Sequence, residues 1–190
     1  AGTGMDAFAH CLEAYCAPGF HPMADGIAVE GLRLIRESLP TAVAKGDDLW
    51  ARSNMMAAAS MGSTAFQKGL GAIHALSHPV GALYGTHHGL TNAVFMPYVL
   101  VFNRPAIEDK AQRIARYMGL PKPSFPALLD WVLKLREDFS IPHTASDLGI
   151  AHSDLDRLST MAADDPTAPG NPVPVGIPEM RKLYENALAG

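Results

Sequence analysis

The sequence is poor in cysteine, in positive charge and in long apolar runs, and each shortage excludes a class of protein. Two cysteines among 190 residues are too few for a disulfide-based scaffold and suit a reducing compartment. Lysine and arginine number 15 against 19 acidic residues, giving a net charge of −4, which argues against binding to nucleic acid or to an anionic membrane. The longest apolar run, 93–102, is about half the length that a bilayer-spanning helix requires. We therefore expect a cytoplasmic protein without a nucleic-acid or membrane partner.

The sequence also lacks segments in which apolar and polar residues alternate, the pattern of a half-buried strand. Apolar residues instead recur at three- and four-residue steps along nearly the whole chain. With 48% hydrophobic residues, a chain of this length can bury a sizeable core. We predict an all-α fold of about eight to ten helices in a single domain, 1–190, with a more buried front half (about 1–104) and a more solvated back half (about 105–190).

Prolines and composition set several expected helix boundaries. One helix should end at Pro40, and Pro79 should kink or interrupt another, because proline removes an amide donor and clashes with the preceding turn. Segments 90–101 and 107–118 are predicted as separate helices. The helix over 49–66 is rich in alanine and methionine and is expected to be buried all round.

Several residues are predicted to mark the ends of helices. Asp47-Asp48 should begin one helix, because carboxylates are favoured in a first turn, and Ser124 should be the N-cap of another. A Ser153-x-x-Asp156 capping box should open the helix that runs to Ala163. Gly119 follows a further segment and is expected to adopt the left-handed conformation that ends a helix.

Eight histidines are many for a chain with seven phenylalanines, and several could share a helix face. Asp6 and His10 are four residues apart, His74 and His78 repeat this spacing, and His87-His88 follow. A carboxylate and several imidazoles that converge in an apolar domain suit a divalent first-row metal. The same residues also have a structural interpretation, because an Asp–His pair can hydrogen-bond on a helix surface and a buried histidine can satisfy a backbone carbonyl. Spacing alone leaves both interpretations open.

Other catalytic patterns are absent. The sequence has no His-Glu-x-x-His and no Cys-x-x-Cys, which removes the zinc-protease and zinc-finger patterns, and no Gly-x-Ser-x-Gly elbow. Gly69-x-Gly71 follows no strand and continues to His74 where a dinucleotide-binding fingerprint needs glycine. Two alternatives stay open: a helical metal-dependent hydrolase, although the adjacent His-Asp pair of helical phosphohydrolases is missing, and a non-catalytic helical module with structural histidines.

Two long motifs carry a family resemblance. Residues 4–15 read GMDAFAHCLEAY, and residues 71–82 read GAIHALSHPVGA and are followed by THHG at 86–89. With the weaker Asn-Pro at 171–172, these segments resemble the iron-containing, metal-dependent alcohol dehydrogenases, in which they belong to the C-terminal helical domain.

The resemblance implies a metal site and its neighbours. Carried over by position, it makes Fe²⁺ or Zn²⁺ the metal, bound by Asp6, His10, His74 and His88. It places His78 beside the site without binding the metal, near the nicotinamide or in proton transfer, with a packed structural role as the alternative. It also places Phe66 in the substrate pocket, although the spacing from Phe66 to His74 departs by one residue from that of a relative.

The resemblance further implies an NAD(P)-linked oxidoreductase that interconverts an alcohol and an aldehyde or ketone. NAD or NADP would be bound mainly by an N-terminal α/β domain, of which this sequence shows no parallel-strand pattern and no phosphate-binding glycine run. We therefore expect this chain to be the helical half of such an enzyme, inactive or weakly active alone, and a homodimer is a further implied partner.

Overall fold

The computed structural model describes residues 1–190, and its elements are eight α-helices and four short 3₁₀ helices. It contains no strand, which confirms the all-α prediction and the expected number of helices. In chain order the elements are α1 (Gly2–Cys16), α2 (Pro22–Ala44), α3 (Leu49–Ala65), η1 (Phe66–Lys68), α4 (Ala72–Tyr84), α5 (His88–Tyr117), α6 (Phe125–Asp138), η2 (Ala145–Leu148), η3 (His152–Asp154), α7 (Leu155–Ala163), η4 (Ala168–Gly170) and α8 (Ile177–Ala189).

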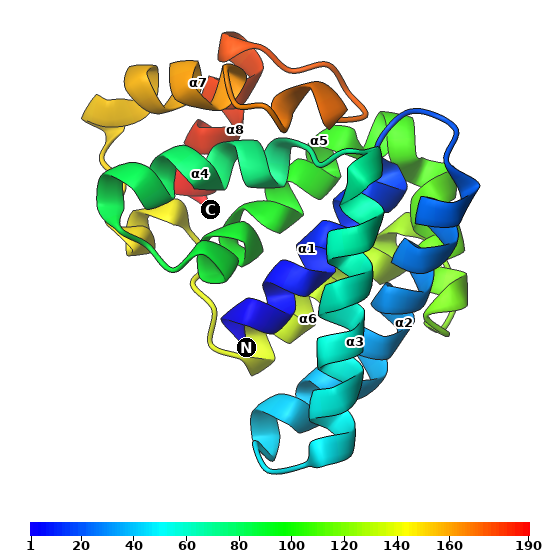
Figure 1. Cartoon of the computed structure of the whole chain (residues 1–190). Coiled ribbons are helices and arrows are strands. Elements are labelled where there is room, and N and C mark those ends of the chain that lie inside the picture. The colour runs from blue at the N-terminus through cyan, green and yellow to red at the C-terminus, as the bar shows by residue number, and fades with distance from the viewer.

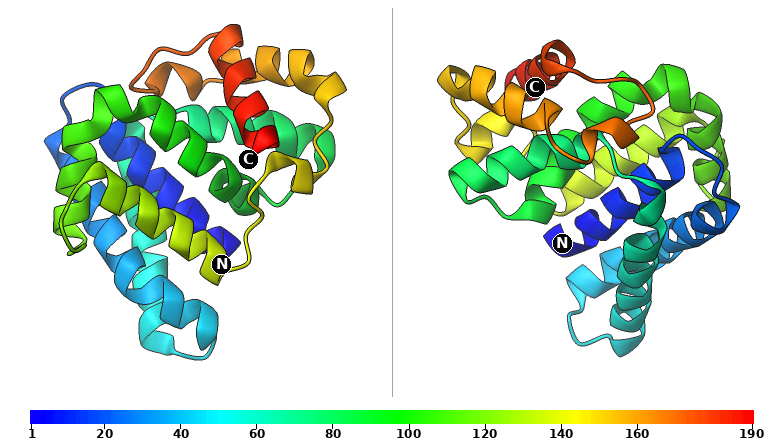
Figure 2. Two further views of the ribbon diagram at one scale, coloured as in Figure 1. Left: turned by 180° about the vertical axis from the view of Figure 1, so that it is seen from behind. Right: turned by 45° about the horizontal axis from the view of Figure 1, so that its top comes forward.

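Helix α1 lies in the middle of the molecule and contacts α2, α3 and α5 (Figure 1). It is apolar on most of its surface, with Met5 and Phe8 fully buried, so neighbours surround it on several sides. Seen from behind, α5 and α6 lie along it (Figure 2). Phe8 packs on Trp131 of α6, with ring centroids 5.1 Å apart. Helices α7 and α8 pack on α4 and α5, and 48 of the buried apolar residues form one cluster. The central position of α1 lets residues on its face reach both α4 and α5.

The prolines break fewer helices than the sequence predicts. Helix α2 continues past Pro40 to Ala44, α4 continues through Pro79, and α5 is one helix that contains both Pro97 and Pro105. The predicted end at Pro40 and the predicted division between 101 and 107 are therefore wrong. A proline inside a helix costs ~3 kcal/mol, and α5 offsets this by packing against α1, α2, α4, α6 and α8.

The prediction that α3 is buried all round is also wrong. Only Ala51, Ala58, Gly62 and Ala65 are buried on it, whereas Trp50 is 77% and Met56 is 70% exposed. Helices α2 and α3 form a hairpin whose tip projects beyond the N-terminal end of α1 (Figures 1 and 2). Helix α3 packs on α2 and α1, and the rest of its surface is exposed.

The predicted helix starts at Asp48 and Ser124 and the predicted helix end at Gly119 are confirmed, whereas the predicted Ser153-x-x-Asp156 box is wrong, because α7 begins at Leu155 after Asp154 and has no side-chain cap. Asp48 accepts a hydrogen bond from Ala51 N at 2.9 Å, and Ser124 Oγ accepts one from Ala127 N at 3.2 Å. Gly119 has a φ of +71°, and the chain turns there so that Leu120 N bonds to Ala115 O. None of the helices has both the length and the apolar character that crossing a membrane demands.

Candidate metal centre

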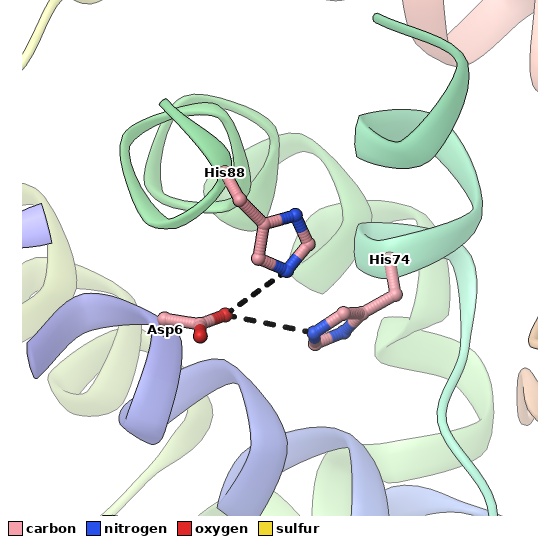
Figure 3. A group of neighbouring side chains, drawn as sticks. All are labelled: Asp6, His74 and His88. Carbon is pink, nitrogen blue, oxygen red and sulfur yellow. Dashed lines mark ion pairs between the residues drawn. The ribbon is translucent and has the colours of Figure 1, made fainter. Parts of the chain in front are cut away.

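Three helices bring a carboxylate and two imidazoles to one place. Asp6 comes from the first turns of α1, His74 from the N-terminus of α4 and His88 from the first residue of α5. Their ligand atoms all lie within 4.8 Å of one another, and the three side chains point toward a common centre (Figure 3). Asp6 Oδ1 is 3.3 Å from His88 Nε2 and 3.7 Å from His74 Nε2.

A glycine allows α1 and α5 to approach closely enough for this cluster. A Cβ atom at Gly89 would overlap the carbonyl oxygen of Gly2 and lie 3.0 Å from Cβ of Asp6. Glycine next to His88 therefore lets the N-terminal ends of the two helices meet, which places the carboxylate of Asp6 opposite the His88 ring.

These separations fit donors that share one metal ion. Two ligand atoms each about 2.1 Å from a tetrahedrally coordinated ion are about 3.4 Å apart, close to the two distances measured from Asp6 Oδ1. The exposure of the three side chains is graded, at 2% for His74, 24% for Asp6 and 42% for His88. The centre is therefore anchored in the core at His74 and open to solvent at His88.

The electrostatics keep negative charge on the carboxylate. Burial would raise the pKa of Asp6, but hydrogen bonds with His74 and His88 outweigh burial and lower the pKa far below its usual range. Burial would likewise lower the pKa of His74, yet the carboxylates of Glu13 and Asp6 raise it to about 9. An ionised carboxylate surrounded by imidazoles is a donor set that suits a divalent cation.

An amide group lies at the centre of the cluster. Asn92 Nδ2 donates a hydrogen bond to Asp6 Oδ1 at 2.8 Å and lies 3.2 Å from His74 Nε2 and 3.1 Å from His88 Nε2. The amide nitrogen thus lies within hydrogen-bond distance of all three ligand atoms, while the buried Asn92 Oδ1 has no hydrogen-bond partner. The three ligand atoms converge on one polar point, and these residues fit a bound cation.

His10 and Phe66 lie beside this trio. The ring of His10 is 4.6 Å from that of His74, and His10 Nδ1 is 3.8 Å from Asp6 Oδ2, the second carboxylate oxygen. Burial and the neighbouring His74 lower the pKa of His10, which favours the neutral form that can bind a metal. Phe66, at the start of η1, packs against His10 with ring centroids 5.3 Å apart and is 37% exposed.

His78 lies one turn after His74 on α4, with its side chain 41% exposed. Its ring stacks on that of His88 at 5.4 Å, and its Nδ1 is 2.8 Å from Asp165 Oδ2. Asp165 is held in turn by Thr167, whose backbone N and hydroxyl both donate to its other oxygen. The His78 ring therefore lies beside the exposed His88, with its Nδ1 held by Asp165.

Comparison with known proteins decides the family. The family described as "Fe-containing alcohol dehydrogenase family, C-terminal" matches residues 1–188 of the chain. The chain belongs to the Fe-containing alcohol dehydrogenases. Curated members of the family include the 4-hydroxybutyrate dehydrogenase of Cupriavidus necator, 39% identical over 99% of this chain, and the NAD-dependent methanol dehydrogenase of Bacillus methanolicus, 35% identical over 98%.

Solved structures agree with this assignment. A 1,3-propanediol oxidoreductase superposes on 99% of the chain with a TM-score of 0.94 at 34% identity. The iron-containing alcohol dehydrogenase from Thermococcus thioreducens gives a TM-score of 0.90 at 29% identity. The chain covers 51% of each of the two curated relatives, and 51% and 50% of the two structures, so it spans about half of their length.

Two residues at this centre were not predicted from the sequence. Glu13 is buried, and its Oε2 lies 2.5 Å from His74 Nδ1. Its position seven residues after Asp6 on α1, among apolar neighbours, was a signal that could have revealed it. Asp165 lies in a loop 87 residues from His78, and no local pattern links the two.

Proposed function

We propose that this chain is the metal-binding catalytic part of an NAD(P)-dependent alcohol dehydrogenase, which interconverts an alcohol and an aldehyde or ketone by hydride transfer. The convergence of Asp6, His74 and His88, in a chain of this family, carries the proposal. Relatives named as dehydrogenases of 4-hydroxybutyrate and of methanol support a small alcohol or aldehyde as substrate.

In this proposal Fe²⁺, or Zn²⁺, is held by Asp6, His74 and His88, with His10 as the fourth ligand. When bound, such a cation supplies Lewis-acid chemistry for an alcohol or carbonyl oxygen. Asp6 contributes the one negative charge of the set, and His74 fixes the position of the site because it is almost fully buried. His88 is the most exposed of the three, so the open side of the centre, where a substrate can enter, lies next to it.

His78 and Phe66 are the proposed residues of the reaction cleft. The bond to Asp165 fixes one nitrogen of His78, so that the other can contact the nicotinamide or move a proton. The half-exposed ring of Phe66 offers an apolar wall beside His10 for the carbon chain of the substrate.

We further propose that residues 1–190 act as one domain, and that NAD or NADP is bound mainly by an N-terminal domain outside this sequence. The match to the C-terminal part of the family and the half-length coverage of its relatives support this division. The isolated chain would then bind the metal but turn over little substrate. A homodimer and a cytoplasmic location complete the proposal, and the two unpaired cysteines fit a reducing compartment.

Metal analysis of the purified 190-residue chain tests the proposal. After loading with Fe²⁺ without oxygen, or with Zn²⁺, we expect a single ion per chain by mass spectrometry. Anomalous scattering should place the ion between Asp6, His74 and His88.

Matched variants make the test specific. His74→Ala and His88→Ala should abolish retention of the ion, whereas His152→Ala, in the exposed helix η3, should retain it. If the chain retained no ion, or if His152→Ala lost it as completely as His74→Ala, the proposed metal centre would be wrong.

A further inference from the structure

We propose that Glu13 is a positioning residue that sets the orientation and tautomer of His74 for metal binding. The inference rests on the proposed metal centre and concerns a side chain that lies outside the ligand set. Glu13 is 6% exposed, and both of its carboxylate oxygens are used.

One oxygen of Glu13 serves the backbone of α4. The first N–H groups of a helix have no partner within the helix. Gly71, at the N-cap of α4, provides no side chain for them, and a Cβ atom there would lie 3.1 Å from Glu13 Oε1. Glu13 Oε1 reaches across from α1 and accepts a hydrogen bond from Ile73 N at 2.7 Å. The start of α4 is thereby fixed to α1, the helix that carries Asp6.

The other oxygen serves the imidazole ring. Glu13 Oε2 lies 2.5 Å from His74 Nδ1. An ionised carboxylate only accepts hydrogen bonds, so it requires the proton on Nδ1 and leaves the lone pair of a neutral ring on Nε2. His74 Nε2 is the atom that faces Asp6 and the Asn92 amide. A carboxylate that holds the second nitrogen of a ligating histidine fixes the ring and strengthens it as a ligand.

Substitution by glutamine separates the two roles. The amide has an oxygen at only one of the two positions that the carboxylate oxygens occupy, so it can accept at one position and must place its NH₂ group at the other. The Ile73 N–H can only donate a hydrogen bond, whereas a neutral imidazole can carry its proton on either ring nitrogen. In Glu13→Gln we therefore expect the amide oxygen to keep the bond to Ile73, and the NH₂ group to donate to His74 Nδ1. The proton then moves to Nε2 and blocks the metal-binding lone pair.

Titration of the metal-free 190-residue chain with Co²⁺ tests the inference. We expect Glu13→Gln to bind Co²⁺ about 10- to 100-fold more weakly than the parent, with altered visible absorption bands at saturation. Its thermal midpoint without metal should stay within about 3 °C of the parent's. Glu179→Gln is the matched control, because Glu179 also accepts from a backbone N–H at a helix start, Gly176 N at 2.8 Å, and we expect it to leave Co²⁺ binding unchanged.

A double-mutant cycle shows whether Glu13 acts through His74 or only through its charge. In a His74→Ala background, Glu13→Gln should change the residual Co²⁺ affinity by less than about threefold. An equal loss in both backgrounds would overturn the inference in favour of a general electrostatic effect. Unchanged Co²⁺ affinity with a lowered midpoint would overturn it in favour of a purely structural cap.

The Co²⁺ titration also covers a variant that does not fold and a parent chain that binds no metal. If Glu13→Gln does not fold, Glu13→Asp replaces it, because a carboxylate one methylene shorter cannot span both donors and should also weaken Co²⁺ binding. If the parent chain binds no Co²⁺, the proposed metal centre fails and this inference fails with it. Binding by the parent together with unchanged binding by the variants removes only the role of Glu13.

Discussion

The glycine after His88 shows how one missing side chain positions the centre. Replacing Gly89 with alanine would press a methyl group against the Gly2 carbonyl and the Asp6 side chain, and neither backbone can move without shifting a whole helix. We expect Gly89→Ala to lower the unfolding free energy by ~1–3 kcal/mol. It should also weaken Zn²⁺ binding, because it drives Asp6 away from His88. Urea unfolding and a Zn²⁺ competition titration measure the two effects.

Gly81→Ala is the control variant, because we expect it to change the unfolding free energy in the opposite direction. It lies inside α4, and a Cβ atom there would meet nothing within 4 Å. Alanine at this position should raise the unfolding free energy by ~0.5–1 kcal/mol, since glycine weakens a helix interior. Equal stability changes for the two variants would contradict the close-approach explanation of Gly89.

The residues of the candidate centre differ in how far the sequence could predict them. Asp6 and His10 lie within one motif, and His74 lies within another, so a local pattern was enough to name them as candidates. That His74 contacts Glu13 could not be read from either motif, because the pair depends on how α4 crosses α1. The contact between Glu13 and its candidate ligand, unlike the position of Glu13 on α1, therefore becomes visible only in the folded chain.

Helix α4 needs side chains from other elements to accept hydrogen bonds from the backbone N–H groups at its N-terminus. Asn171, from the loop before α8, accepts from Ala72 N at 3.1 Å through Oδ1 and exchanges two hydrogen bonds with the Asn103 amide at 2.8 and 2.7 Å. Both asparagines are buried. Together with Glu13, Asn171 provides the cap that Gly71 cannot, and the helix that carries His74 is held from α1, α5 and the C-terminal loop.

Removal of the Asn171 amide should therefore lower the unfolding free energy. Asn171→Ala leaves the Ala72 N–H and the Asn103 amide buried without partners, at ~1–3 kcal/mol for each unsatisfied group. We expect a loss of roughly 2–4 kcal/mol in unfolding free energy by urea denaturation. The double variant Asn103→Ala/Asn171→Ala should lose less than the sum of the single variants, because each single change already breaks the shared pair. Strict additivity would show that the two amides act independently.

The helices themselves were largely predictable, and the failures share one cause. Asp48 and Ser124 act on the backbone three residues away, so the sequence predicted both helix starts correctly. Pro97 and Pro105 favour a break locally, but the packing of α5 on five other helices keeps it continuous. The exposure of α3 likewise depends on the hairpin that it forms with α2, which composition does not encode.

The candidate ligands lie on three helices that meet at one centre, although α1 is far from α4 and α5 in the sequence. Asp6, His74 and His88 belong to α1, α4 and α5, so a cation bound to all three can stay only while these helices are in place. A ligand that binds only the folded state stabilises it by ~2.7 kcal/mol at a free concentration of 100 times its Kd. For a chain of this size, that corresponds to a rise in Tm of roughly 5–11 °C. We expect this rise with Zn²⁺ by calorimetry, its reversal by EDTA, and no rise in Asp6→Ala.

The same binding should slow hydrogen exchange unevenly across the fold. Backbone amides in α1, α4 and the start of α5 should gain protection when Zn²⁺ binds, because local opening of these helices would break the site. The projecting tip of the α2–α3 hairpin carries none of the candidate ligands, and its exchange should not change (Figure 1). Equal protection of the hairpin tip and of α4, or a Tm rise that persists in Asp6→Ala, would place the ion elsewhere on the molecule. Protection confined to α1, α4 and α5 would instead follow from a cation that joins these three helices.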